Sequence, residues 1–288
     1  TMSFPACWSL HLHSRPATPA QAQRGILCRR ILRSVTPISG STTSIFATHG
    51  LITPTDRRML SASVAPTAAS TTADSTLTRI LYVSLLMLLV GCRDGQTDHA
   101  QVYVGKLGNA YFYKNIIAGQ TDFLYGFGTA WIQSSDILLR NCGGGITAWK
   151  GTNTTFENQY GVYIVDSTVR AANAFIAPVI AGKCALGRPW NSLHRSIFAN
   201  TYEDGSIEPS GYIDWVVSGV SRFTNQTVMA EYKAFGPGFN ATGRAEGGVT
   251  IVMDKKQYKR YDSPAKVFQS PDGKTGNIGW IDFHADRV

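Results

Sequence analysis

The sequence is poor in charged side chains, which make up 16% of its 288 residues, whereas it contains 28 glycines. Few charges and many glycines are typical of β-rich proteins built from many short strands and turns. Hydrophobic residues still amount to 43% and aromatic residues to 11%, so a sizeable core can form and a wholly disordered chain is excluded. Five cysteines are too few for a small disulfide scaffold.

Acidic residues are scarce in the N-terminal third, and this scarcity accounts for most of the net charge of +8. Residues 1–79 hold eight arginines, no lysine and two acids, which gives +6. Residues 100–288 hold 18 basic and 15 acidic residues, which gives +3, and residues 80–99 contribute −1. Because no basic stripe with interleaved aromatic residues accompanies the charge, we expect no nucleic-acid partner.

No part of residues 1–79 keeps a helical or strand periodicity for more than a few residues. This segment contains six prolines and a run of serine, threonine and alanine at 61–72. We therefore predict that residues 1–79 are a disordered leader or a mispredicted segment. Their arginine-rich, acid-poor composition leaves a transit peptide as the alternative.

No hydrophobic run is long enough to cross a bilayer. Residues 80–90 (ILYVSLLMLLV) are eleven apolar-dominated residues, whereas a membrane-spanning helix needs about 20. We assign 80–99 to an apolar segment and junction with no stable membrane span. A displaced secretory signal core, a buried strand or helix, and a membrane anchor remain the three interpretations. Three glycosylation sequons, at Asn153, Asn225 and Asn240, favour a secreted glycoprotein.

From about residue 100 the pattern changes, because short apolar runs alternate with turns that contain Gly and Asn. The runs cover residues 110–118, 130–141, 161–169, 196–201 and 211–217. Small polar residues accompany them at Asn115, Asp136, Asp166 and Asn200, which gives a loose recurrence of 20–35 residues. Since no amphipathic helices alternate with the runs, a Rossmann or TIM-type layout is disfavoured. We predict an all-β domain at 100–288, a parallel β-helix of stacked coils.

Two local clusters carry candidate chemistry. Residues 119–128 (GQTDFLYGFG) place one carboxylate, Asp122, before a strand of alternating aromatic residues. A solvated turn or cap is the ordinary interpretation, but a carboxylate beside aromatic rings suits a nucleophile at a sugar-binding site. Residues 186–190 (LGRPW) fix the backbone on both sides of Arg188, so that its guanidinium is aimed at a partner. The alternative is a turn with a surface arginine; arginine is nevertheless the side chain best suited to bind a carboxylate bidentately.

Together these clusters resemble the pectin methylesterases (pectinesterases, carbohydrate esterase family 8). Residues 122–126 (DFLYG) are similar to the nucleophile motif of that family, and 186–190 (LGRPW) match its second signature residue for residue. Segments 145–149 and 210–215 also resemble family segments, and 230–232 and 236–238 near the end resemble those of the secreted fungal or bacterial branch. The resemblance covers roughly residues 101–265. It implies a right-handed parallel β-helix whose N-terminal coils are missing or replaced.

The resemblance also implies the chemistry. It makes Asp122 the nucleophile that attacks a methyl ester of pectin, and Arg188 the residue that holds this carboxylate ionised and aimed. Trp190, Tyr125 and Gln101 are the expected substrate-binding residues. The products would be methanol and galacturonate, and the partner would be the polysaccharide homogalacturonan. We expect an extracellular monomer.

At one position the chain departs from the family pattern. A second aspartate, preceded by glutamine, should lie about 21 residues before Asp122 and protonate the leaving methanol. This chain has His99 and Ala100 there. The alternative function is therefore a catalytically impaired or truncated relative that at most binds galacturonan.

Other chemistries find little support. The six histidines are scattered, so we expect no metal, and no cofactor is implied. Pectate lyases would need calcium-binding acid clusters and polygalacturonases several close aspartates, and the sequence shows neither. We expect Cys142 and Cys184 to be free, inward-facing small residues of the solenoid.

Overall fold

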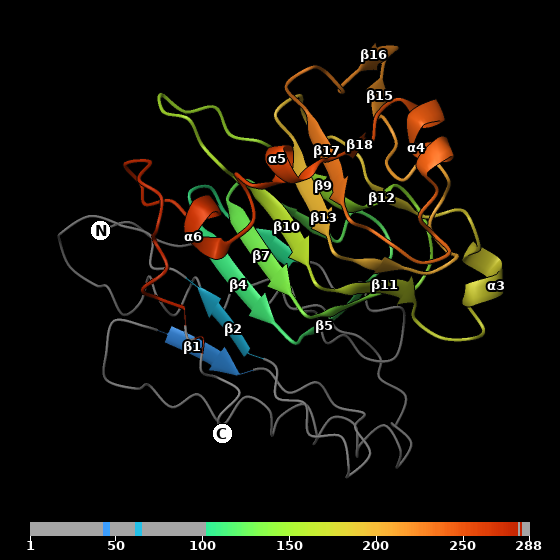
Figure 1. Cartoon of the computed structure of the whole chain (residues 1–288), viewed down its shortest axis with the longest axis horizontal. Coiled ribbons are helices and arrows are strands. Elements are labelled where there is room, and N and C mark those ends of the chain that lie inside the picture. Colours follow the sequence, from blue (N-terminus) through green and yellow to red (C-terminus); the bar gives the residue numbers. More distant parts are fainter. Residues whose placement is uncertain (1–42, 47–60, 65–101, 282, 284–288) are drawn as a thin grey trace, which may run out of the picture. The chain divides into compact units, whose positions relative to one another are not determined.

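The structure is a computed structural model that describes residues 43–46, 61–64, 102–281 and 283. Most of this part is built from three sheets of parallel strands (Figure 1). The long sheet has the order β1-β2-β4-β7-β10-β13-β17-β18. Its strands are β1 Thr43–Phe46, β2 Ser61–Val64, β4 Asn109–Tyr113, β7 Thr129–Gln133, β10 Gly161–Val165, β13 Arg195–Ala199, β17 Val228–Tyr232 and β18 Ile251–Val252. From β4 to β18 the pairing is parallel, whereas β1, β2 and β4 pair antiparallel.

Two four-stranded parallel sheets complete the coils. One contains β14 Tyr202–Glu203, β11 Thr168–Ala171, β8 Asp136–Leu139 and β5 Ile116–Gly119. The other contains β12 Ala185–Gly187, β9 Gly145–Trp149, β6 Leu124–Gly126 and β3 Val102–Val104. Because each turn of the chain supplies one strand to each sheet, the predicted parallel β-helix is confirmed.

The remaining elements lie outside the coils. A small antiparallel hairpin is formed by β15 Val216–Val217 and β16 Val220–Ser221. The helices are α3 Ala177–Ile180, α4 Ala241–Gly247, α5 Lys255–Tyr258 and α6 Pro264–Val267. No helix within the described residues has the length and hydrophobicity required to cross a membrane. Residues 80–90 and the rest of the predicted junction lie outside the described part, as does the predicted leader except for β1 and β2.

The coil period follows from the strand register. Equivalent positions in the long sheet are Asn109, Thr129, Gly161 and Arg195, so successive coils are 20, 32 and 34 residues long. The expected recurrence of 20–35 residues is therefore confirmed.

A bend ends each strand of the long sheet and repeats the same backbone conformation. Lys114, Ser134, Asp166 and Asn200 all have φ between 50° and 53°. Polar residues at or beside the bend stack from coil to coil; for example, Asn200 Nδ2 donates to Asp166 Oδ1 at 3.1 Å. Two of the predicted small polar positions thus share one bend, whereas Asp136 begins β8 instead.

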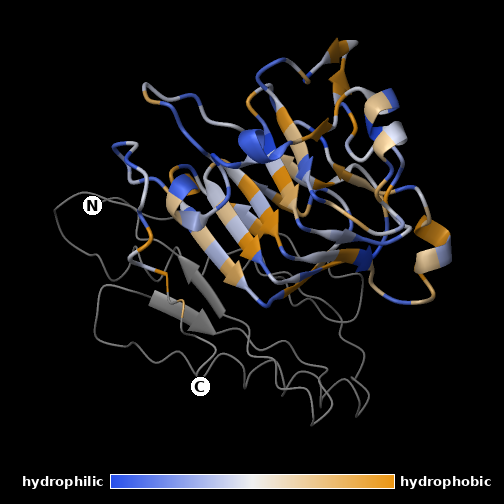
Figure 2. Cartoon of the chain, viewed as in Figure 1, coloured by the Kyte–Doolittle hydropathy of each residue, from blue (hydrophilic) through white to orange (hydrophobic). Residues whose placement is uncertain are grey.

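The long sheet is buried on both faces. One face stacks Phe112, Ile132, Ile164 and Phe198 in register into the interior of the coils. The other face carries Tyr111, Trp131 and Tyr163, and the C-terminal segment with α5 and α6 covers them with Tyr258, Tyr261 and Phe268. Figure 2 shows the resulting apolar bands along these strands. Burial on both faces explains why the strands read as continuous apolar runs.

One predicted run is wrong as a strand. Within 211–217 only the last two residues form a strand, β15, and the preceding residues are a loop. Gly211 has φ +75°, and an added Cβ there would lie 2.6 Å from Arg244 Nε. The segment still hydrogen-bonds to β12 through Gly211 and Ile213, but the left-handed backbone of Gly211, against which the Arg244 side chain packs, interrupts a regular strand.

Candidate active site

Asp122 lies in the bend just before β6, with a left-handed backbone conformation of φ 49°. Its backbone N–H donates to the carbonyl of Gly145 at 2.6 Å, and its carboxylate Oδ1 accepts from the Gly145 N–H at 3.0 Å. Asp and Asn tolerate this conformation better than most residues do. The next coil, through Gly145, thus fixes both the backbone and the side chain of Asp122.

Arg188 follows β12 directly and reaches Asp122 across the intervening coil. Its Nη2 lies 2.6 Å from Asp122 Oδ2, and its Nε donates to Oδ1 at 3.1 Å and to Oδ2 at 3.2 Å. The side chains are 23% and 16% exposed, so the pair is partly shielded while remaining accessible. The structure thus brings together the two residues that the sequence singled out, in the forked geometry that arginine forms with a carboxylate.

Glycine makes room for the guanidinium. Gly144 has φ +78°, and an added Cβ would lie 2.7 Å from Arg188 Cζ. The backbone of this loop therefore packs directly against the Arg188 guanidinium, which any side chain would displace.

A second tryptophan, which the sequence reasoning did not assign, supports the pair. The Arg188 Cζ atom lies 4.0 Å from the ring centroid of Trp215, a close cation–π contact. Trp215 in turn meets Trp190 edge to face at 5.7 Å between ring centroids. Trp190 is 39% exposed. Segment 210–215 resembles a family segment, but nothing in its spacing indicates contact with Arg188.

Tyr125 lies on the same sheet as the pair, in β6. Its ring is 5.2 Å from that of Tyr103 in the coil before, and Tyr103 meets Phe127 edge to face at 6.1 Å. Burial, and then the neighbouring Tyr103, raise the pKa of Tyr125 above its usual value, so the phenol stays neutral. Neutral aromatic faces of this kind suit contact with sugar rings.

The pectinesterase family model matches residues 95–269, which is more than half of the chain and includes all of these residues. The chain belongs to the pectinesterase family. The matched segment is slightly longer at both ends than the resemblance seen in the sequence, which covered roughly 101–265.

Curated pectinesterases match over part of their length. A putative pectinesterase/pectinesterase inhibitor 38 of Arabidopsis thaliana is 30% identical over 174 residues, which are 59% of this chain and 35% of that protein. A probable pectinesterase/pectinesterase inhibitor 33 of the same plant is 35% identical over 138 residues, 46% of this chain and 23% of that protein. The chain therefore spans about a third or less of the length of these relatives.

Among solved structures, the pectin methylesterase of Aspergillus niger superposes with a TM-score of 0.50 at 20% identity. The match covers 66% of this chain and 62% of that chain. At this identity the comparison supports the fold alone, and it agrees with the parallel strand order.

Not every predicted site position can be placed. Gln101, together with His99 and Ala100, lies outside the described residues. Its predicted contact with substrate therefore stays a prediction.

The expectation for the cysteines is wrong. Cys142 and Cys184 form a disulfide, with their Cα atoms 5.0 Å apart. Cys142 precedes the glycine loop that packs on Arg188, and Cys184 precedes β12. The bond is possible because Gly145 and Ala185 are partners in the strand register, which brings the two preceding corners together.

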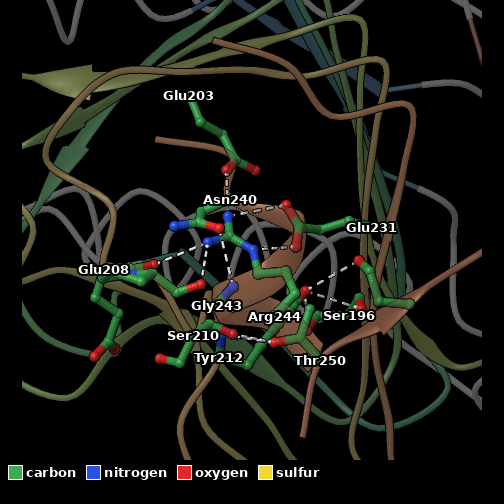
Figure 3. Close-up of polar contacts among 12 residues, drawn as sticks. Ser196, Glu203, Glu208, Ser210, Tyr212, Glu231, Asn240, Gly243, Arg244 and Thr250 are labelled. Carbon is green, nitrogen blue, oxygen red and sulfur yellow. Dashed lines mark hydrogen bonds and ion pairs between the residues drawn. The ribbon is translucent and has the colours of Figure 1, made fainter. Parts of the chain in front are cut away.

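A buried ionic cluster anchors the segment that leads to Trp215 (Figure 3). Arg244 of α4 donates from Nε to Glu231 Oε2 at 2.7 Å and from Nη2 to Glu203 Oε2 at 2.8 Å, and all three side chains are fully buried. Its Nη1 donates to the carbonyls of Glu208 and Pro209, each at 2.9 Å. The cluster thus ties two coils and α4 to the loop before β15.

Proposed function

We propose that this chain hydrolyses the methyl esters of pectin, with Asp122 as the nucleophile and Arg188 as the group that aims it. The observation that carries the proposal is the forked ion pair between these residues in a member of the pectinesterase family. Exposed Trp190 and the half-buried Tyr125 would contact the galacturonan chain.

The chemistry is a double displacement. An Asp122 oxygen forms a bond to the ester carbonyl carbon, the carbonyl π electrons move to oxygen, and the oxyanion then expels methoxide, which takes up a proton and leaves as methanol. Water next attacks the resulting anhydride. Its oxygen goes to the galacturonyl carbon, the Asp122 carboxylate is released, and two protons are set free, one of which restores the proton donor. The net reaction converts one ester and one water into methanol, galacturonate and a proton.

The pair alone accounts for only part of this reaction. Within the described residues, the hydrogen bonds of the Asp122 carboxylate come from Arg188 and the Gly145 N–H. Neither group is a suitable proton donor to methoxide, since a guanidinium does not deprotonate in proteins. The family pattern would place the donor at Ala100. This observation favours the second candidate function, a relative that binds galacturonan and turns it over slowly or not at all.

Release of methanol from methylated pectin tests the nucleophile. We expect Asp122→Asn to abolish release while circular dichroism stays unchanged, because the amide keeps the shape and tolerates the left-handed backbone but cannot attack. Asp136→Asn is the matched control, since Asp136 is paired with Arg170 at 3.5 Å on a different sheet. Turnover retained in Asp122→Asn would remove Asp122 from the role.

A second experiment separates the two candidate functions. If the donor is missing, the double variant His99→Gln/Ala100→Asp should raise the rate, by up to the roughly 10²–10⁴-fold that general acid–base catalysis contributes. The matching single variant Ala100→Asn supplies the shape without the proton and should gain nothing. Full activity in the unmodified chain would show that the acid comes from another residue and would reject the impaired relative.

We also propose that the protein acts outside the cell as a monomer on polymeric substrate. The sequons support the location: Asn153 and Asn225 are exposed, and Asn240 is exposed although its side chain caps α4 by accepting from the Gly243 N–H. A shift in mobility after treatment with an endoglycosidase and the elution volume in size-exclusion chromatography test these two points.

A further inference from the structure

The strand β9 lies between the two strands that carry the ion pair. The sheet has the order β12-β9-β6-β3, and Asp122 comes just before β6 whereas Arg188 comes just after β12. The two side chains therefore meet across a strand to which neither belongs, and their alignment depends on how β6 and β12 are each attached to β9. On the β6 side the attachment is Gly145, which both donates to Asp122 and accepts from it.

Thr147, in the middle of β9, provides the attachment on the β12 side. It is the register partner of Gly187, and its carbonyl accepts from the Arg188 N–H at 3.0 Å. Its hydroxyl donates to the carbonyl of Leu186 at 3.0 Å. Thr147 thus holds the end of β12 through its backbone and its side chain together.

The hydroxyl of Thr147 is restrained from the interior of the coils. Ser196 Oγ lies 3.1 Å from Thr147 Oγ1 and 2.8 Å from Nε2 of His194, and all three residues are 0% exposed. A buried hydroxyl is stable only when it is hydrogen-bonded. The neighbours of Thr147 therefore fix its side chain in the orientation that reaches β12.

The same hydroxyl explains the glycine that precedes Arg188. A Cβ on Gly187 would lie 2.0 Å from Thr147 Oγ1 and 3.0 Å from Cε1 of Tyr212. Gly187 does not have a positive φ, so lack of space rather than backbone conformation excludes a side chain there. The end of β12 thus packs directly on the Thr147 hydroxyl.

We propose that Thr147 is a positioning residue, whose buried hydroxyl fixes the end of β12 and thereby aims Arg188 at Asp122. Its consequence for catalysis rests on the proposed function, whereas the positioning itself is a property of the folded chain. Without the hydroxyl, the buried Leu186 carbonyl loses a hydrogen bond and the end of β12 is held through backbone alone. Arg188 then keeps its charge but approaches the carboxylate in a less uniform geometry. A loss of this kind lowers kcat rather than raising KM.

Methanol release from methylated pectin by Thr147→Val measures this consequence. Valine has nearly the shape of threonine and lacks the hydroxyl. We expect kcat to fall about tenfold and KM to change less than about twofold, a smaller loss than the roughly 10²-fold that a misplaced catalytic group costs. Thr147→Ser keeps the hydroxyl and should recover most of kcat. A role in packing alone would give the opposite order, because serine leaves a larger gap than valine.

Thr201→Val is the matched control. Thr201 is also 0% exposed, and its hydroxyl also donates to a backbone carbonyl, that of Ala199 at 3.2 Å. It follows the bend after β13, outside the sheet that carries the ion pair. Its midpoint of urea unfolding should fall as in Thr147→Val while kcat stays unchanged. An equal fall of kcat in both variants would reduce the effect to lost stability and overturn the positioning role.

A measurement on Arg188 itself needs no turnover. Its Nε–H donates to both carboxylate oxygens of Asp122, at 3.1 and 3.2 Å, so exchange of this hydrogen with solvent reports how well the pair is aligned. In the NMR spectrum this hydrogen gives the arginine signal that is missing in Arg188→Lys. We expect its exchange to be about tenfold faster in Thr147→Val, the effect of losing one hydrogen bond, and close to the wild-type rate in Thr147→Ser and Thr201→Val.

Exchange and turnover together separate the positioning role from the proposed function. If the wild type hydrolyses no pectin but the Arg188 Nε–H exchanges faster in Thr147→Val, the proposed function fails and the positioning role stands. Unchanged exchange in Thr147→Val overturns the positioning role whether or not pectin is hydrolysed, and so does an unchanged kcat in an active protein. If Thr147→Val does not fold, Thr147→Ala, which cannot press on Gly187, takes its place with the same expectations.

Discussion

Asp122 is held by backbone as much as by side chains. Its N–H donates to the Gly145 carbonyl and one carboxylate oxygen accepts from the Gly145 N–H, so these two bonds hold Asp122 in place independently of Arg188. Arg188 adds direction, because its Nε and Nη2 contact both carboxylate oxygens. A substitution at Arg188 therefore changes the aim of the carboxylate more than its location.

We predict that Arg188→Lys is not conservative. Lysine keeps the charge but loses the planar fork and the contact with the Trp215 ring, so the carboxylate is aimed less well. A misplaced catalytic group costs on the order of 10²-fold in rate, and we expect kcat to fall by this amount while KM changes little. Steady-state methanol release measures both constants. An unchanged kcat would make Arg188 a structural turn residue.

At the residue scale the sequence predicts the reacting residues better than the residues that hold them in place. Asp122 and Arg188 stand in recognisable motifs, and Trp190 is part of one. The sequence does not assign Trp215, because its contact with Arg188 depends on how a loop outside the coils folds back. Sequence spacing carries no information on such a return, whereas it does carry the period of the coils.

At the scale of elements, a disulfide joins two corners of the sheet that carries the site. Cys142 begins the loop whose Gly144 packs on the Arg188 guanidinium, and Cys184 stands just before β12, which ends next to Arg188. The bond thus links the loop that packs on Arg188 to the strand that Arg188 follows. Its 42-residue separation in sequence makes it a substantial constraint on the unfolded chain.

We predict that removing the disulfide lowers the free energy of unfolding by about 2–4 kcal/mol. Urea unfolding of the double variant Cys142→Ser/Cys184→Ser, followed by tryptophan fluorescence, measures the loss. Reductant should destabilise the wild type by a similar amount and leave the variant unaffected. Methanol release should also fall, because the glycine loop against Arg188 is less fixed. A wild type indifferent to reductant would show that the two thiols are not joined in solution.

The sequence predicts the coils but not the corners. Four of the five apolar runs contain strands of the coils, and their recurrence gives the period. The run at 211–217 fails, because the left-handed backbone of Gly211, packed against the buried Arg244 side chain, interrupts the strand. The sequence does not predict the disulfide either, because 42 residues separate the cysteines and the register of β9 with β12 brings them together.

At the scale of the whole molecule, the described part of the chain buries His194 and Glu203 in uncharged form. Burial lowers the pKa of His194 to about 3; its Nδ1 donates to the Trp149 carbonyl and its Nε2 accepts from Ser196 Oγ. Burial, and then the carboxylate of Glu231, raise the pKa of Glu203 to about 10. One guanidinium, that of Arg244, balances one carboxylate, so the second acid in the cluster keeps its proton.

These two groups make stability depend on pH in opposite directions. His194 takes up a proton in the unfolded chain below about pH 6.5 but in the folded protein only near pH 3, so its contribution is lost as pH falls through this window. Glu203 ionises in the unfolded chain near pH 4.5 but in the folded protein only near pH 10. Its contribution is present below pH 4.5 and is lost as pH rises towards 10.

We predict a stability maximum between about pH 4.5 and 6.5, where the two slopes cancel, and a decline above it of about 1 kcal/mol per pH unit. Glu203→Gln should flatten this decline, because the amide still accepts from Arg244 Nη2 but has no proton to lose. Urea unfolding between pH 5 and 9 gives the slopes. Exposed Glu157, replaced by glutamine, is the control and should leave the decline unchanged. Equal slopes in the wild type and Glu203→Gln would mean that Glu203 is ionised in the folded protein, with Arg244 serving both carboxylates at once.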